Sequence, residues 1–138
     1  MIRYTDQIAG IRPEQLAGFF EGWPDPPTPD THLKVLAASD EVALAIDDQT
    51  SAVVGFITAI SDGVLSAYIP LLEVLPDHRG QGIGHELLRI MLQRLDGLYM
   101  IDLICDARAQ PFYQSAGMEP ATGMVRRNYE RQSARHRG

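Results

Sequence analysis

Three glycines at alternate positions stand where a helix should begin. Gly80, Gly82 and Gly84 directly precede an apolar run with helical spacing. Glycine is among the poorest helix formers, but the first turn of a helix leaves N–H groups unpaired and carries partial positive charge. Glycine lets an anion approach these groups closely, and Arg79 adds a permanent cation. The stretch therefore predicts a phosphate-binding loop, with a tight strand-to-helix connection as the alternative.

Other familiar motifs are excluded or weak. The loop lacks the Lys-Ser or Lys-Thr pair of a nucleoside triphosphatase, and His85 stands where a GxGxxG loop needs its third glycine. Cys105 is the only cysteine, and the four histidines lack close metal-ligand spacing, so no metal is expected. Cys105 ends an apolar run, which fits a buried structural thiol better than a nucleophile.

The glycine loop resembles the pyrophosphate loop of the GNAT superfamily of N-acetyltransferases. The family pattern Q/R-x-x-G-x-G/A is matched by the run from Arg79 to Gly84. A second block, PFYQSAGM at 111–118, resembles the family's late helix, with Met118 where Phe is usual. The resemblance implies one α/β (mixed α+β) domain over residues 1–138. Its mixed, mostly antiparallel sheet would have six to seven strands, flanked by about four helices.

The resemblance also implies acetyl-CoA as donor and an amine as acceptor. The pyrophosphate would rest on the loop amides, and the pantetheine arm would run beside the fourth strand. Asp106 replaces an Asn that often contacts this arm; a carboxylate cannot donate a hydrogen bond, so a helix cap is the alternative. The implied donor-binding residues are Leu72, Val74, Arg79, Gly80, Gln81, Gly82, Ile83, Gly84, His85 and Asp106.

The catalytic candidates follow from the same chemistry. Tyr113 matches the family's general-acid tyrosine, with a core aromatic as the alternative, and the resemblance implies the Val74 amide as the oxyanion donor that this chemistry needs. Full proton transfer from a tyrosine (pKa about 10) to a thiolate (pKa about 8.5) is uphill by roughly 2 kcal/mol, so a hydrogen bond is expected. The amine needs a base or a water chain. Glu73 is the catalytic candidate beside the donor strand, and Asp102, Tyr68 and His32 also remain open.

The acceptor side is expected in the N-terminal third. The loop GWPDPPTPD at 22–30 contains four prolines, which lower the entropy lost on ordering a binding wall. Phe20, Trp23, His32 and Tyr68 are the candidate substrate-binding residues, although Trp23 could instead plug the edge of the core. A net charge of −6 favours a small-molecule or peptide amine and argues against nucleic acid. A CoA-binding regulatory module without turnover is the alternative function.

Composition and periodicity set the remaining expectations. With 138 residues and 45% apolar content, the chain can bury one core. No apolar run approaches bilayer length, no signal core is visible and cysteine is scarce, so a cytoplasmic protein is expected, with a homodimer open by analogy. Pro70 in the third long strand marks a bulge or an edge. We expect helices at 13–21, 32–39, 83–97 and 108–117, and strands at 2–4, 41–47, 52–60, 64–76, 98–105 and 124–129.

Overall fold

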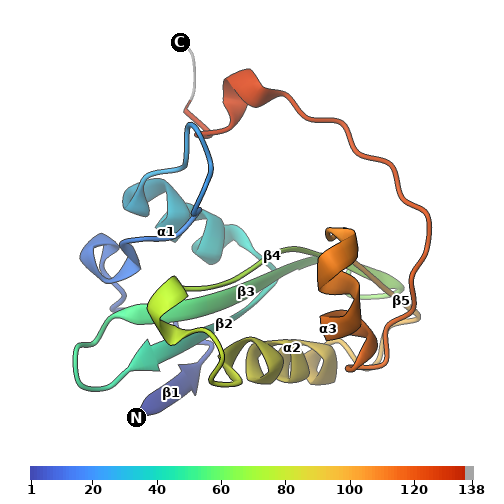
Figure 1. Cartoon of the computed structure of the whole chain (residues 1–138), viewed down its shortest axis with the longest axis horizontal. Coiled ribbons are helices and arrows are strands. Elements are labelled where there is room, and N and C mark those ends of the chain that lie inside the picture. Colours follow the sequence, from blue (N-terminus) through green and yellow to red (C-terminus); the bar gives the residue numbers. More distant parts are fainter. Residues whose placement is uncertain (136–138) are drawn as a thin grey trace.

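One sheet of five strands forms the centre of the molecule (Figure 1). A computed structural model describes residues 1–135. The strands lie in the order β1-β2-β3-β4-β5, and only the β4–β5 pair is parallel. Parallel neighbours need a crossover, which α2 supplies here. The strands are Ile2–Thr5, Glu41–Asp47, Val53–Ser61, Ser66–Val74 and Met100–Asp102.

Helices cover both faces of the sheet. On one face, α2 packs a stripe of apolar side chains against the sheet, as its 3.6-residue spacing predicts. On the other face, α1 and the turn at Pro13–Leu16 cover β2 and the first half of β3 with a second core cluster. The α-helices are Pro29–Ala38 (α1), Ile83–Arg94 (α2) and Gln110–Gln114 (α3). Short 3₁₀ turns lie at Pro13–Leu16, Pro76–His78, Ala107–Ala109 and Tyr129–Arg131.

A β-bulge interrupts β4 where Pro70 predicted a disruption. Thr58 pairs with Leu71 and Ile60 pairs with Tyr68, so β4 advances three residues while β3 advances two. The extra residue reverses the alternation of side chains. Ile69 and, after the bulge, Val74 both pack toward α2, whereas Tyr68 and Leu71 belong to the opposite face. The bulge is confirmed, and proline suits it because it has no N–H to donate.

The prediction of a C-terminal strand at 124–129 is wrong, and the sheet has five strands rather than the six or seven expected. This segment is extended but forms no backbone–backbone hydrogen bond with the described residues before the turn at Tyr129–Arg131. Met124 is 96% exposed. The segment arches away from the sheet (Figure 1) and returns to the N-terminal loop, where Gln132 accepts a hydrogen bond from the Asp25 N–H at 2.8 Å. A strand needs a neighbouring edge as well as suitable residues, and the sequence does not show whether an edge lies within reach.

Two further elements are shorter than expected. The helix expected at 13–21 is a single 3₁₀ turn, because Gly18 (φ +95°) and Phe20 (φ +63°) adopt left-handed backbone conformations. The strand expected at 98–105 pairs only at Met100–Asp102, since the chain then leaves β4. Within residues 1–135, no helix is long and apolar enough to cross a membrane.

Candidate active site

The glycine loop presents a row of free backbone donors. Gly80 (φ +78°) and Gly82 (φ +83°) are left-handed, and a Cβ on either would meet no atom within 4 Å. Gly82 caps α2 and its carbonyl accepts from the Glu86 N–H at 3.1 Å. The N–H groups of residues 80–85 have no hydrogen-bond acceptor among the described residues. Free N–H groups at a helix N-terminus, with open space before them, fit a phosphate group.

A hollow of about 380 Å³ opens between this loop, the end of β4 and α3. Gly84 lies against the Phe112 ring, which a Cβ at this position would meet at an ordinary contact distance of 3.4 Å. The His85 ring lies 4.4 Å from the same Phe112 ring. The hollow is lined by Leu72, Glu73, Val74, His78, Arg79, Gly80, Gly82, Ile83, Gly84, His85, Ala109, Phe112 and Tyr113.

Most of the predicted donor residues therefore come together. Gln81 and Asp106 are not among those that line the hollow. Asp106 occupies the N-cap of the 3₁₀ turn at Ala107–Ala109, yet its side chain makes no capping hydrogen bond. Sequence reasoning missed His78, Ala109 and Phe112. Phe112 could have been found, because it adjoins Tyr113 in the block at 111–118 that resembles the family's late helix.

The second half of β4 has a free main-chain edge. Its pairing with β5 ends at Tyr68 and Asp102, so the strands separate beyond this point. The Leu75 N–H donates to the Val54 carbonyl at 2.8 Å. Because backbone direction alternates along a strand, Val74 turns its N–H and C=O away from β3. This carbonyl accepts from Arg79 Nε at 2.9 Å, and the N–H is left free at the hollow.

Tyr113 reaches the hollow from α3. Burial raises the pKa of Tyr113, and the nearby Cys105 thiol adds to this rise. The phenol therefore stays protonated at neutral pH and can donate a hydrogen bond. A raised pKa also makes full proton transfer from this tyrosine to a thiolate more uphill, so donation of a hydrogen bond is the stronger chemical role.

The Glu73 side chain makes structural hydrogen bonds to the N-terminal loop. Its carboxylate accepts from the N–H groups of Phe20 (2.9 Å) and Glu21 (3.3 Å), which fixes the left-handed turn at Phe20. Arg79 adds a second tie, because its guanidinium donates to Glu21 at 2.9 Å. These contacts fasten the N-terminal loop to the end of β4, beside the hollow. Arg79 is thus held at the loop by a carboxylate and a carbonyl.

Direct substrate contact by His32 is contradicted by its burial. His32 is 1% exposed, and neither ring nitrogen has a hydrogen-bond partner among the described residues. Its ring packs 4.4 Å from Phe56 and 4.9 Å from Phe20. Desolvation lowers the pKa of His32 to about 4, so the imidazole is neutral and acts as a core ring.

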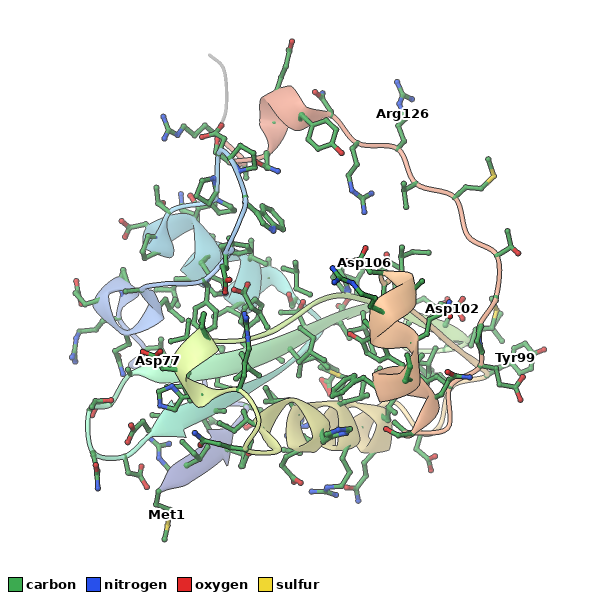
Figure 2. All side chains as sticks on the ribbon, viewed as in Figure 1. Met1, Asp77, Tyr99, Asp102, Asp106 and Arg126 are labelled. Carbon is green, nitrogen blue, oxygen red and sulfur yellow. The ribbon has the colours of Figure 1, made fainter. Side chains whose placement is uncertain are left out.

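The other acceptor-side candidates lie at the surface or just beneath it. Phe20 is buried, and Trp23 packs on it with ring centroids 4.9 Å apart while remaining 38% exposed. Tyr68 does not line the donor hollow; it lies in a second hollow at the other end of β4, with Asp102. In Figure 2, Arg126 points outward from the C-terminal arch.

The fold and the loop define an acetyltransferase, and comparison with known proteins supports this directly. The sequence pattern of the acetyltransferase (GNAT) family matches residues 8–118. The chain therefore belongs to the GNAT family, whose members use acetyl-CoA. Within residues 1–135, no group of three or more His, Cys, Asp or Glu side chains could hold a metal ion.

Solved structures carry the same fold. A proposed acetyltransferase from Deinococcus radiodurans R1 is 45% identical, with a TM-score of 0.93 over 96% of this chain and 92% of that one. A GNAT-family acetyltransferase from Streptococcus pneumoniae TIGR4 is 29% identical, with a TM-score of 0.75 over 93% and 98%. Glucosamine-6-phosphate N-acetyltransferase from Arabidopsis thaliana, at 10% identity and a TM-score of 0.68 over 93% and 98%, shares the fold alone. No curated protein sequence matches significantly.

Proposed function

We propose that residues 1–138 act as one N-acetyltransferase that moves an acetyl group from acetyl-CoA to a primary amine of a small molecule or peptide. The transfer is a direct attack of the amine in a ternary complex. The observation that carries the proposal is the row of free N–H groups at residues 80–85, continued by the free edge of β4. This arrangement fits a diphosphate followed by an extended arm with amide groups.

Each group in the hollow has a separate task. The loop N–H groups and Arg79 hold the diphosphate. Bound acetyl-CoA supplies an activated thioester carbonyl. The Val74 N–H donates to the carbonyl oxygen, where negative charge develops during attack. The Tyr113 phenol donates to the departing sulfur, and its protonated state at neutral pH supports this role.

Glu73 is better placed to position the loop than to accept a proton. Both carboxylate oxygens already accept backbone N–H groups from the N-terminal loop. Proton removal by this group would require these hydrogen bonds to break. We therefore assign Glu73 a positioning role beside the hollow and leave removal of the amine's proton to water.

A paired binding and turnover experiment tests the proposal. Calorimetry should detect binding of CoA and acetyl-CoA to the folded protein. A thiol-release assay with acetyl-CoA and a broad panel of primary amines should detect thiol that depends on the amine. CoA binding without such release would contradict turnover and favour a regulatory module. Absence of CoA binding would contradict the whole proposal.

A further inference from the structure

A second hollow, of about 310 Å³, lies at the far end of β4 on the face of the sheet opposite α2. Strand register places Ile60 beside Tyr68 and Tyr68 beside Asp102. These three side chains form a row across β3, β4 and β5, and all three are exposed. The second core cluster covers β2 and the first half of β3 but does not include this row. The row is therefore an open apolar surface ending in a carboxylate.

The row lies next to the point where β4 separates from β5, the edge along which the proposed function places the thioester arm. The Tyr68–Asp102 pair is the last contact between β4 and β5 before the two strands separate. The bulge follows at once, and the donor hollow begins at Leu72, four residues farther along the strand. The two hollows thus lie at opposite ends of the bulged part of β4.

The two carboxylates of this hollow differ in what they can bind. Asp62 accepts from the N–H groups of Val64 and Leu65 at 2.8 Å and of Ser66 at 3.2 Å, so its oxygens close the β3–β4 turn. The Asp102 side chain makes no hydrogen bond or ion pair with the described residues. Its carboxylate is therefore free, on the strand position that faces Tyr68 across the β4–β5 pair. A carboxylate beside an aromatic face suits an alkylammonium group through charge and cation–π attraction.

The other groups considered for the acceptor amine are committed elsewhere. Glu73 holds the N-terminal loop, and His32 is neutral within an aromatic cluster. We propose, on the basis of the proposed function, that the acceptor is a cationic alkyl amine and that Asp102 and Tyr68 bind its ammonium. The site then selects alkyl amines, which are charged at neutral pH, over neutral aromatic amines.

The chemical balance defines the role of Asp102. The bound ammonium releases one proton to water, and its nitrogen forms a C–N bond to the thioester carbonyl carbon. The C–S bond breaks, and the sulfur leaves as a thiol after taking a proton. The sum is one amide, one thiol and one proton released. A solvent-exposed carboxylate is a far weaker base than an alkyl amine, so Asp102 binds and orients the amine rather than retaining its proton.

The test uses the full chain saturated with CoA and three probes. Butane-1,4-diamine and butylamine are cationic at pH 7, and aniline is neutral. Calorimetry should show that Asp102→Asn weakens binding of both alkyl amines at least tenfold and leaves aniline and CoA unchanged. Tyr68→Leu should weaken the alkyl amines about threefold to tenfold. Asp96→Asn, which removes an exposed carboxylate after α2, is the matched control and should change nothing.

Kinetics and salt give independent readouts. In the thiol-release assay, Asp102→Asn should raise the KM for alkyl amines about tenfold and change kcat less than threefold. Added salt should weaken alkyl-amine binding by the wild type more than by Asp102→Asn, because an ion pair is screened. Equal affinities in both proteins, no alkyl-amine binding by the CoA-loaded wild type, or an equal loss for aniline would each overturn this inference while leaving the proposed function intact. Failure to bind CoA would overturn both.

Discussion

The donor side and the acceptor side of this molecule use different parts of the chain. The donor hollow is built from consecutive main-chain N–H groups at residues 80–85 and from the free edge of β4. The acceptor side that we propose is built from side chains that meet only after folding, such as Tyr68 on β4 and Asp102 on β5. Backbone groups are common to all residues, so the donor side depends on conformation. The acceptor side depends on residue identity.

The largest effect is expected when the conformation of the donor loop is disturbed. Gly82→Val places a β-branched residue at φ +83°, a conformation that such residues rarely adopt. The loop must shift, and the loss of two charge-assisted N–H hydrogen bonds, at roughly 2 kcal/mol each, would weaken CoA binding about 1,000-fold. Calorimetry measures this loss.

Gly63→Val is the matched control for this change. Gly63 has φ +75° in the β3–β4 turn, and a Cβ there also meets nothing within 4 Å. The backbone strain is comparable, but the donor loop is remote. CoA affinity should therefore be retained after any loss of stability, and equal losses in both variants would argue against a direct role for the loop.

A second large effect tests whether the aromatic cluster around His32 is purely structural. The pKa of His32 falls to about 4 in the folded chain, against about 6.5 in an unfolded one. The unfolded state takes up a proton first as pH falls, so the stability contributed by neutral His32 is complete above pH 6.5 and lost toward pH 4. The free energy of unfolding should drop by up to about 3 kcal/mol over this range.

His32→Leu separates this contribution from other titrating groups. Denaturant unfolding at pH 7, 6, 5 and 4 should give a flatter profile for the variant, because leucine binds no proton. Asp62, whose pKa is lowered to about 2 by backbone N–H groups, keeps its contribution through most of this range and does so in both proteins alike. Parallel profiles would show that the imidazole is not buried in its neutral form.

A smaller effect is expected from Tyr113, the donor-side group proposed to face the departing sulfur. Tyr113→Phe removes the phenol O–H and keeps the ring, so CoA affinity should stay within twofold. Turnover in a chemistry-limited assay should fall about 100-fold, the range for loss of a proton-donating group. Tyr99→Phe, at an 83% exposed tyrosine, is the control. An unchanged rate would remove Tyr113 from the mechanism.

The smallest effect is expected from Glu73, which ties the N-terminal loop to the end of β4 beside the donor hollow. Glu73→Gln leaves one oxygen for the Phe20 N–H but turns an amide N–H toward Glu21, which also donates. The free energy of unfolding should fall by about 1 kcal/mol, and the KM for amines should rise a few-fold with little change in kcat. A fall in kcat of about 100-fold, with a shifted pH profile, would instead identify Glu73 as the base.

Much of the fold and the donor side could be predicted from the sequence. Helical periodicity identified α2, alternation identified β2 and β3, and Pro70 marked the bulge. The loop could be predicted because a local run of glycines determines a local conformation. The donor residues on β4 and α3 followed from the family resemblance.

The remaining features depend on partners distant in sequence. The extended segment at 124–128 has strand-like residues but no neighbouring edge. The sequence alone made His32 a reasonable surface candidate. In the folded chain its ring packs against Phe19, Phe20 and Phe56, which lie elsewhere in the sequence. The Tyr68–Asp102 pairing required the register of β4 on β5, which no local pattern encodes.

The inserted residue at the bulge also governs how far β4 can follow its neighbour. Removing Pro70 would restore the regular alternation and leave Glu73 and Val74 on their present faces, because the side chains on either side of the extra residue would then alternate without interruption. A deletion would instead remove the local twist that a bulge adds to a strand. A straighter β4 would stay alongside β5 beyond Tyr68, and the main-chain edge that now lies free would be taken up by the sheet.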